Sequence, residues 1–490
     1  MDRHLLIHKF RTKKGNQYIY DVSTNKTYAV NCLELYLIEH PSLLSRTDLD
    51  TDLKARFSNQ DIKLSKRNVS SWISDDNAFY LKDFELTDFY SEKEYYEEVN
   101  NLEQMVLEVS ANCNLNCSYC YRNDFTVKYA PPLKMSWEIA RKSIDYFIDK
   151  INTPNRIILK NNSALNFYGG EPLLNFAVIY KSLEYIKRLN LDDNIIFNLT
   201  SNGTLINRKS ADLLANYNVQ LLISLDGPKT EHDKNRADRY GRGSFDRIME
   251  NLTLLKSEYP TYFENNVLIN AVYNVKTDID STIRFFTSLK TSLSPKLQVK
   301  FSFDSLTKSD RHEDKDLFSA KLASAKADFI NSKRISNRQN FDKNKLLILE
   351  KLFSPYFNNL WNRGYKQPSR LNFFAGSCKP GIRKIYVDTH GNFHICEQID
   401  NSFIIGNCWE GLNFHKVNSI VCDFKNSLLT DCQYCIALNF CDICFARAGK
   451  YGKFSKDSKC QLRRDSIIKQ IEEYYSLLEE NPVLFNDNPK

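Results

Sequence analysis

Long apolar runs are missing from this chain of 490 residues, which has no stretch of about eighteen apolar residues and no signal-peptide core at its start. We therefore expect a cytoplasmic protein without a membrane partner. A large charge of one sign is missing too, because 67 basic and 60 acidic residues are interspersed and leave a net charge of +7. This balance is typical of a solvated surface and indicates no nucleic-acid partner.

Cysteine, by contrast, is plentiful, with 13 residues. Reducing conditions in the cytoplasm disfavour disulfides, so clustered thiols there indicate metal ligation or redox chemistry. The chain is also too long for one ordinary core, which predicts roughly two to four domains. The positions of the cysteines within those domains are therefore the main guide to function.

Strand and helix patterns alternate from about residue 105 onward. Strands are predicted at 106–110, 164–168, 195–200, 220–225, 267–273 and 297–303. Helices are predicted at 136–151, 176–189, 208–217, 245–257, 278–289 and 316–332. Six strand–helix pairs predict an α/β fold, with a parallel sheet joined by right-handed crossovers. Since a closed barrel of the TIM type has eight such pairs, we expect a partial (β/α)6 barrel with its site at the carboxyl ends of the strands.

The regions on either side differ from this alternating pattern. Before it, strands at 5–10, 17–22 and 27–30 precede helices at 33–39, 49–57 and 68–73, which predicts a small antiparallel sheet followed by helices. After it, a bridging helix is predicted at 343–353 and a loop at 364–370. Beyond Cys378 the periodicity fades while cysteines accumulate, so we expect a small domain held together by metal more than by a core.

The first cysteine group, Cys113, Cys117 and Cys120, directly follows the first predicted strand. Three thiolates can hold three irons of a four-iron cube and leave the fourth iron open to a reactant. A structural zinc loop is the alternative, although such sites close four ligands at other spacings. With Tyr119 beside the last cysteine, the group resembles the radical S-adenosylmethionine (SAM) superfamily. The resemblance implies that SAM binds the open iron and is cleaved to a 5'-deoxyadenosyl radical.

The second predicted strand ends in Gly169, Gly170, Glu171 and Pro172. Glycines let backbone approach a ligand closely, and a carboxylate can neutralise an ammonium group. The sequence resembles the GGEP element of the same superfamily, which holds the methionine amino group of SAM. Read alone, it is equally typical of a turn.

The third and fourth predicted strands end in polar residues that are also typical of caps and turns. The resemblance implies that three of them contact the ribose or the methionine carboxylate: Ser201, Asn202 and Ser224. It makes Asp226 a structural or substrate-side carboxylate. Arg236 would pair with the SAM carboxylate, with Arg239 and Arg242 as competitors and a surface ion pair as the alternative.

Seven further cysteines follow a regular scheme, namely Cys378, Cys396, Cys432, Cys435, Cys441, Cys444 and Cys460. The gap of five residues between the two C-x2-C pairs is shorter than in a zinc ribbon, which favours iron–sulfur ligation. The scheme resembles the SPASM extension of radical SAM enzymes, which implies two auxiliary clusters and therefore three [4Fe-4S] clusters in all. The family usually has three residues, not two, between the third and fourth cysteines of the later group, which puts Cys444 in doubt.

The resemblance assigns these cysteines to two sites. The distal cluster would be held by Cys432, Cys435, Cys441 and Cys460, and the proximal cluster by Cys378, Cys396 and Cys444. Either Cys408 or Cys422 completes the proximal site, or it is open to a substrate thiolate. Glu397 follows Cys396 where sulfatase-maturing relatives carry an acidic general base, although a solvated glutamate fits equally well.

SPASM proteins act on peptides or proteins, and the N-terminal pattern resembles the winged-helix domain that captures a precursor's leader as an added strand. The segments 8–10 and 18–25 are similar to maturases of cysteine-rich peptides. The implied partners are a precursor peptide with a leader sequence and an electron donor such as flavodoxin or ferredoxin. The implied domains are leader recognition (1–100), radical SAM partial barrel (101–340), bridging helix and linker (341–375), SPASM (376–470) and a tail (471–490).

The leading hypothesis is therefore a radical SAM peptide maturase that forms a thioether or carbon–carbon crosslink in a ribosomally made peptide. An open proximal iron would favour the thioether. The first alternative is a sulfatase-type maturase that oxidises cysteine or serine to formylglycine. The second is not an enzyme but an iron–sulfur electron carrier or a zinc-stapled binding scaffold.

Overall fold

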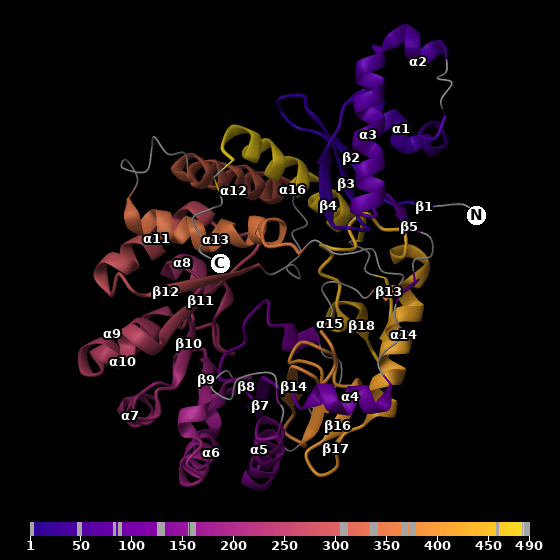
Figure 1. Ribbon diagram of the computed structural model, residues 1–490. Coiled ribbons are helices and arrows are strands. Elements are labelled where there is room, and N and C mark those ends of the chain that lie inside the picture. Colours follow the sequence, from indigo (N-terminus) through magenta and orange to yellow (C-terminus); the bar gives the residue numbers. More distant parts are fainter. Residues whose placement is uncertain are drawn as a thin grey trace.

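The computed structural model describes residues 4–46, 51–81, 85–86, 91–124, 133–154, 156, 163–303, 312–333, 342–364, 371–372, 378–456, 460–482 and 484. Within these ranges, no helix is long and apolar enough to cross a membrane. Figure 1 shows one large sheet flanked by helices, with the N-terminal elements forming a separate lobe above it. Most of the loop predicted at 364–370 lies outside the described residues.

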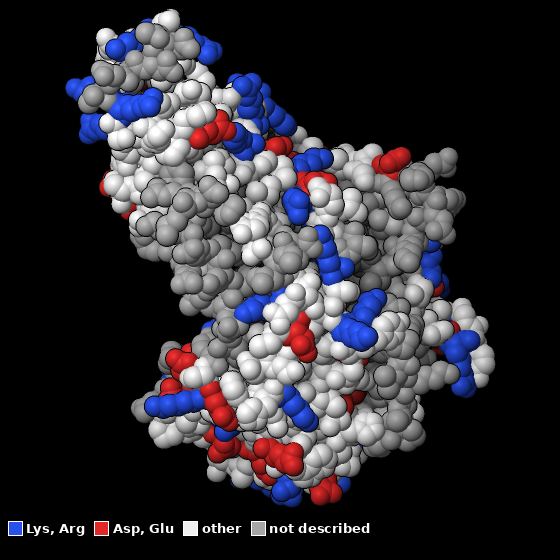
Figure 2. Space-filling view, turned by 90° about the vertical axis from the view of Figure 1, so that its right-hand side faces the viewer, with Lys and Arg blue, Asp and Glu red and all other residues white. Residues whose placement is uncertain are grey.

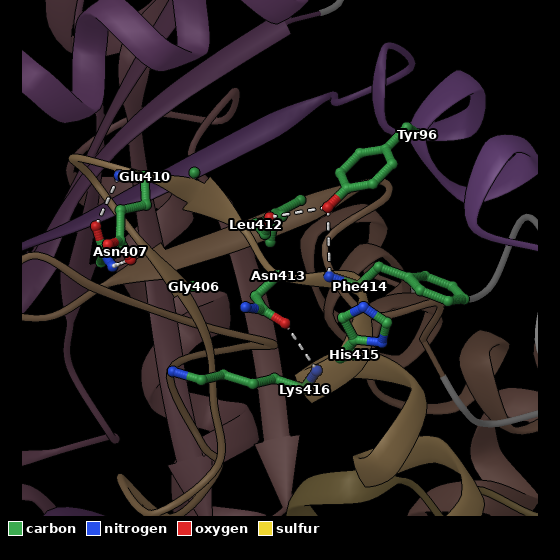
Figure 3. Close-up of a pocket in the computed structure, with 10 residues that line it drawn as sticks. Tyr96, Gly406, Asn407, Glu410, Leu412, Asn413, Phe414, His415 and Lys416 are labelled. Carbon is green, nitrogen blue, oxygen red and sulfur yellow. Dashed lines mark hydrogen bonds between the residues drawn. The ribbon is translucent and has the colours of Figure 1, made fainter.

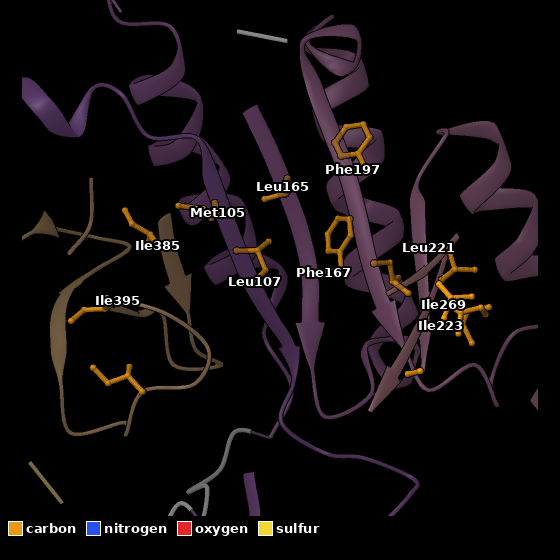
Figure 4. Close-up of a cluster of buried hydrophobic side chains, with 14 of the residues drawn as sticks. Met105, Leu107, Leu165, Phe167, Phe197, Leu221, Ile223, Ile269, Ile385 and Ile395 are labelled. Carbon is orange, nitrogen blue, oxygen red and sulfur yellow. The ribbon is translucent and has the colours of Figure 1, made fainter. Parts of the chain in front are cut away.

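Six parallel strands form the first part of the large sheet, and all six were predicted. They are β7 (Gln104–Ser110), β8 (Ser163–Gly169), β9 (Ile195–Ser201), β10 (Gln220–Ser224), β11 (Val267–Tyr273) and β12 (Gln298–Phe303). They pair in sequence order, from β7 next to β8 through to β12 at the edge. Apolar side chains of alternate residues, such as Leu165, Phe167 and Ile223, form the core that Figure 4 shows between the strands and their helices.

The helices between these strands return the chain to the start of the next strand. They are α5 (Trp137–Ile151), α6 (Phe176–Arg188), α7 (Arg208–Asn216), α8 (Lys229–Asn235), α9 (Phe245–Glu258), α10 (Pro260–Asn266) and α11 (Ile279–Ser292). After β12 come α12 (His312–Lys333) and α13 (Lys343–Trp361), so the predicted bridging helix is longer than expected. The resulting arrangement is an α/β fold in which the carboxyl ends of the parallel strands share one rim.

The C-terminal region differs from the metal-held domain that we expected. Its strands β14 (Lys384–Val387), β15 (Asn392–His394), β16 (Ile404–Asn407) and β17 (Gly411–Leu412) continue the large sheet. Strand β14 pairs parallel to β7, and the last three strands pair antiparallel, which gives a mixed sheet of ten strands. Ile385 and Phe393 are buried in the same apolar cluster as Leu107. The strands are too short for periodicity to reveal them, but they share the main core.

Two long helices also belong to this region, α14 (Phe414–Cys432) and α16 (Cys460–Glu480). They accompany the short α15 (Phe445–Ala448) and the hairpin β18 (Gly449–Lys450) to β19 (Lys453–Phe454). The stretch expected to be a tail from 471 is thus helical as far as Glu480. Ile471, Tyr474 and Leu477 of this stretch are buried, which explains why it is folded.

The N-terminal unit has the antiparallel sheet that the sequence predicts. Its strands are β2 (Ile7–Arg11), β3 (Gln17–Asp21) and β4 (Lys26–Ala29), with β3 in the middle, and its helices are α1 (Cys32–Glu39), α2 (Thr51–Arg56) and α3 (Asn59–Asp75). Short pairs join β1 (His4–Leu5) to β5 (Tyr80–Leu81) and β6 (Glu85–Leu86) to β13 (Leu371–Asn372), and α4 (Glu92–Val99) leads to the large sheet. One sheet face, with Ile19 and Tyr28, packs on α1 and α3.

Candidate functional site

The candidate site lies on the rim formed by the carboxyl ends of the parallel strands. The first two strands meet there with no room for side chains, since a Cβ on Gly169 would lie 2.1 Å from the Ser110 carbonyl oxygen. A Cβ on Gly170 would lie 2.4 Å from the Asn112 carbonyl oxygen. Gly169 also has a φ of 135°, which favours glycine. The two glycines therefore let strand β8 press against the backbone that leads into Cys113.

Glu171 ties the ends of β8 and β9 together. Its Oε1 accepts hydrogen bonds from the Ser201 hydroxyl at 2.9 Å and the Leu173 N–H at 3.1 Å, and its Oε2 accepts one from the Asn202 N–H at 2.8 Å. Burial raises the pKa of Glu171 to about 7, although these hydrogen bonds oppose the rise. Pro172 begins the 3-10 turn that follows. Glu171 thus orders the rim by holding the next strand, in addition to any contact with an ammonium group.

Asp226 is the centre of a second buried network, just past the end of β10. Its Oδ2 accepts hydrogen bonds from Arg236 Nε at 3.0 Å and from the Tyr119 hydroxyl, and its Oδ1 accepts one from the Val272 N–H at 3.1 Å. Arg236 also lies over the Tyr119 ring, 5.3 Å from its centroid. Asp226 and Arg236 are nearly fully buried, at 2% and 7% exposed. The network joins the cysteine loop to β10 and β11.

His232, which the predicted site did not include, supports this network. Its Nδ1 accepts from the Asp226 N–H at 3.2 Å, and its Nε2 lies 2.9 Å from the Ser244 hydroxyl, which in turn donates to the Arg236 carbonyl. Burial lowers the pKa of His232 to about 4, so the imidazole is neutral with its proton on Nε2. In the sequence, His232 could have been noticed because it lies four residues before Arg236, one helical turn away at the end of α8.

Two of the other predicted contacts occupy the same rim. Ser224 is the buried last residue of β10. The Asn202 amide donates to the Asn114 side chain at 2.9 Å and lies 3.7 Å from the Cys113 sulfur, so it braces the cysteine loop. Arg239 and Arg242, by contrast, both stack on the exposed Tyr240 ring, away from the Asp226 network. The structure thus separates Arg236 from its two competitors.

The group of Cys113, Cys117 and Cys120 lies on a loop above the rim. Burial raises the pKa of Cys113 and raises that of Cys117 to about 11, and the neighbouring Cys120 thiol adds to both shifts. Thiolates there need a nearby cation, which bound iron would supply. Backbone hydrogen bonds tie this loop to the segment after α8, from Asn116 N–H to the Ala237 carbonyl at 2.7 Å and from Ser118 N–H to the Asn235 carbonyl at 2.9 Å.

The later cysteines fall into two groups. Burial raises the pKa of Cys378 and raises that of Cys396 to about 12, and Cys444 is among the charges that add to both shifts, so these three thiols are neighbours. Burial also raises the pKa of Cys441, with Cys435 adding to the shift. Two other members of the predicted distal set lie at helix ends. Cys432 is the last residue of α14, and Cys460 is the first residue of α16.

The two cysteines considered as a further ligand lie elsewhere. Cys408 is buried near Gly391, where a Cβ would lie 2.7 Å from its sulfur, and Asp388 is among the charges that shift its pKa upward, after burial. Cys422 lies within α14 with its sulfur 3.9 Å from Asn418 Oδ1 one turn earlier. Neither is among the charges that act on Cys378 or Cys396. The structure therefore gives no support to either as a fourth proximal ligand.

Among the described side chains, no group of three or more His, Cys, Asp or Glu is arranged to hold a single metal ion. In a four-iron cluster each cysteine binds a different iron, so its thiols surround a larger volume than the ligands of one ion do. Three neighbouring thiols at each of two places, with donors of the type that iron–sulfur clusters use, fit such clusters.

Glu397 and Tyr168 connect the rim with the later cysteines. Lys384 Nζ lies 2.5 Å from Glu397 Oε2. Burial raises the pKa of Tyr168, and the charges of Glu397 and Cys120 add to this shift, so Tyr168 lies near both. The Tyr121 hydroxyl is 3.3 Å from that of Tyr168. Tyr121 directly follows Cys120 and could have been suspected, whereas no local pattern marks Lys384.

The pocket in Figure 3 is separate from this site. It has a volume of about 290 Å³ and lies where β17 meets the start of α14, lined by Tyr96, Asn407, Glu410, Asn413, His415 and Lys416 among others. The Tyr96 hydroxyl forms two hydrogen bonds with backbone groups that line the pocket. It donates to the Leu412 carbonyl at 3.3 Å and accepts from the Phe414 N–H at 3.4 Å. None of the predicted site residues lines this pocket.

Residues 107–285 match the Radical SAM superfamily. This range begins in β7 and contains the cysteine loop, the Glu171 network and the Asp226 network. The chain therefore contains a radical SAM domain, and enzymes with this domain use SAM and a [4Fe-4S] cluster.

Three known proteins show how far the similarity extends. A cysteine-type anaerobic sulfatase-maturating enzyme of Clostridium novyi is 30% identical over 196 residues, 38% of this chain and 48% of that protein. The radical SAM cyclopropyl synthase TigE of Paramaledivibacter caminithermalis is 32% identical over 219 residues, 39% of this chain and 43% of TigE. The structure of native anSMEcpe with bound AdoMet superimposes with a TM-score of 0.56 at 18% identity, over 79% of this chain and 98% of that one.

The chain thus spans about half or less of the length of the curated relatives that it matches. The similarity to anSMEcpe concerns the fold, which includes the large sheet beyond the matched family range. The radical SAM domain and the α/β fold predicted from the sequence are confirmed, while the reaction that this chain catalyses is a matter for proposal.

Proposed function

We propose that this protein is a peptide maturase in which SAM, bound at Cys113, Cys117 and Cys120, supplies a deoxyadenosyl radical that starts crosslink formation in a precursor peptide. The carrying observation is that Tyr168, next to the GGEP element, lies near both Cys120 and Glu397. The cysteine loop at the rim and Glu397, which directly follows Cys396, are therefore close to the same side chain. Auxiliary clusters there would accept the electron that an oxidative crosslink releases.

The surrounding side chains have separate tasks in this proposal. Arg236 and Tyr119, held by Asp226, orient the SAM end at the cysteine loop. A crosslink removes two hydrogens from the peptide, one as an atom and the other as a proton and an electron. Glu397, paired with Lys384, is the carboxylate placed to accept that proton. An exchange of Glu397 for Gln should preserve deoxyadenosine formation while stopping crosslink formation.

Known relatives support a peptide or protein substrate. Two of them are sulfatase-maturating enzymes by name, from Clostridium novyi and Bacteroides thetaiotaomicron. The protein anSMEcpe was solved with a bound peptide, Cp18Cys, as well as AdoMet. In this chain, the substrate would enter between the rim and the later cysteines.

The N-terminal sheet offers an edge for the leader of that peptide. Among the described strands, β4 pairs with β3 alone. The Val30 N–H donates to the Gln17 carbonyl of β3 at 2.9 Å, so the alternate N–H groups of Thr27 and Ala29 point to the open side. An extended peptide can add there as a further strand.

Exposed basic side chains on two helices of the same unit favour an acidic leader. Figure 2 shows Lys and Arg gathered on the upper lobe, the N-terminal unit, whereas both signs are mixed over the body below. Exposed basic residues on α2 and α3 are Lys54, Arg56, Lys63 and Arg67. Helix α3 packs on β4 through Trp72 and Tyr28, whose ring centroids are 5.1 Å apart. Replacing Arg67 by Glu should therefore weaken leader binding, most strongly at low salt.

The decisive experiment incubates the reconstituted enzyme with its precursor peptide and follows peptide mass and deoxyadenosine together. Each crosslink should lower the peptide mass by two hydrogens. Ala29→Pro, which removes an N–H at the open edge, should abolish leader binding, whereas Ala29→Val should preserve it. Deoxyadenosine without any change in peptide mass, in the unmodified enzyme, would contradict the proposal.

A formylglycine-forming maturase is the second candidate, because Glu397 lies next to Cys396 as in sulfatase-maturing relatives. Such an enzyme has no need of a leader, so Ala29→Pro should then leave its activity on a short cysteine or serine peptide unchanged. Loss of activity in Ala29→Pro but not in Ala29→Val favours the leader-dependent maturase.

A further inference from the structure

The N-terminal sheet has a second face that the leader does not use. Alternate residues on this face are aromatic, Phe10 on β2 with Tyr18 and Tyr20 on β3. They pack on the C-terminal region, with Phe10 and Tyr18 at 5.6 and 5.3 Å from the Tyr475 ring and Tyr20 at 5.5 Å from the Phe440 ring. We refer to Phe10, Tyr18 and Tyr20 as the docking face. It lies within the segments that resemble peptide maturases.

The docking face contacts the loop between two predicted distal ligands, Cys435 and Cys441. The Asn439 amide donates to the Tyr20 hydroxyl at 2.8 Å and to the Val22 carbonyl at 2.7 Å. The Tyr20 hydroxyl donates onward to Asn25 at 2.9 Å and is buried, at 1% exposed. A side chain two residues before Cys441 is therefore held by the N-terminal sheet.

The hairpin formed by β2 and β3 also contacts the helix that begins at Cys460, α16. Near the far end of α16, the Glu479 Oε1 accepts hydrogen bonds from Thr12 at 2.9 Å, Asn16 at 2.9 Å and Tyr18 at 2.8 Å. The Lys13 N–H donates to the Ser476 hydroxyl at 3.1 Å. A helix is stiff over this length, so fixing its end restricts where its first residue lies.

We infer that the docking face clamps the distal cluster site, by holding both the Cys435–Cys441 loop and the helix that starts at Cys460. This inference rests on the proposed function, because it takes these cysteines as cluster ligands. The N-terminal unit then has two separable roles, since the clamp uses one face of β2 and β3 while the leader uses the edge of β4. Deleting the whole unit would remove leader binding and loosen a cluster at once.

The test measures iron release from the anaerobically reconstituted full chain into a chelator. Wild type should hold about twelve irons, four per cluster. Asn439→Ala removes the hydrogen bonds to Tyr20 and to the Val22 carbonyl, and should speed the release of about four of these irons by roughly tenfold. Tyr20→Phe, a smaller change, should speed it by roughly threefold.

Two comparisons make the result specific. Tyr28→Phe removes a hydroxyl that donates to Asp76 within the N-terminal unit at 2.8 Å, so its iron release should match wild type. In the Tyr20→Phe/Asn439→Ala double variant, release should be less than the product of the two single effects, because both changes remove one shared hydrogen bond. Leader affinity should be unchanged in Asn439→Ala and in Tyr20→Phe, because neither residue lies on β4.

Unchanged iron release in Asn439→Ala would overturn the clamp while leaving the proposed function in place. A wild-type protein that holds only about four irons would overturn both, because the later cysteines would then bind no cluster. Equal acceleration by Tyr28→Phe and Tyr20→Phe would also overturn the clamp, since it would reflect general loosening of the N-terminal sheet.

Discussion

The radical SAM rim and the later cysteine region hold their thiols in different ways. On the rim, strand ends, buried carboxylates and backbone hydrogen bonds surround the cysteine loop, with Glu171 and Asp226 each accepting three hydrogen bonds. In the later region, Cys432 ends one helix and Cys460 begins another, and the N-terminal sheet braces the loop before Cys441. The rim is therefore built by one continuous part of the chain, whereas the loop before Cys441 is also held by the distant N-terminal sheet.

Removing a thiol from the rim should have the largest effect. Cys117→Ser should abolish deoxyadenosine formation and lower the iron content by about four per chain, because the cluster loses one of its three ligands. The same exchange at Cys32, on α1 of the N-terminal unit, should leave both unchanged. Iron analysis and deoxyadenosine chromatography measure the two quantities. Full iron content in Cys117→Ser would remove this cysteine from the ligand set.

Breaking the Asp226 network should come next. Asp226→Asn leaves Arg236 buried without its carboxylate, and such losses cost about 3–5 kcal/mol of folding free energy. Urea unfolding at pH 7 measures the change. The control is Asp246→Asn, since the ion pair of Asp246 with Lys229 is exposed and should matter little. Similar stability of the two variants would mean that the rim is not held by this network.

Low pH should reduce the stability of the folded rim, because His232 is buried in its neutral form. Its pKa is about 4 in the folded chain and about 6.5 when unfolded, so the unfolded state takes up the proton first as pH falls from about 6.5 toward 4. The free energy of unfolding should therefore be about 2 kcal/mol lower at pH 5 than at pH 7. His232→Gln should lose this part of the pH dependence, as urea unfolding at pH 7 and pH 5 would show. An unchanged pH dependence in the variant would assign it to other groups.

The smallest effect is expected at Cys408 and Cys422. Neither is among the charges that act on Cys378 or Cys396, so we expect that replacing either by Ser leaves the iron content unchanged. A loss of iron from either variant would make that cysteine a proximal ligand after all. It would also show that this region rearranges around its cluster.

Much of the fold was accessible from sequence patterns. The six parallel strands were predictable because buried strands read as short apolar runs between amphipathic helices. Helix α14 could have been found as well, since Val417, Val421, Phe424 and Leu428 recur at helical spacing. Helix α3 is longer than predicted, because a buried serine, Ser65, interrupts its apolar stripe.

The candidate site divides in the same way. The sequence indicated the cysteine groups, the GGEP element and Arg236, all of which have local spacing. It did not indicate that Lys384 pairs with Glu397, that Tyr168 lies near both Cys120 and Glu397, or that Asn439 bonds to Tyr20. These contacts join residues that are far apart along the chain, and no local pattern records them.

The sequence by itself determined that this chain carries a radical SAM domain on a parallel α/β sheet, because ligand spacing and hydrophobic periodicity are local properties. The tertiary structure decided where the other parts belong. It placed β14 beside β7, which makes the later cysteine region part of the main sheet, and it set the N-terminal sheet against α16. Strand pairing and buried hydrogen bonds between distant segments depend on the folded chain as a whole, which is why only the structure reveals them.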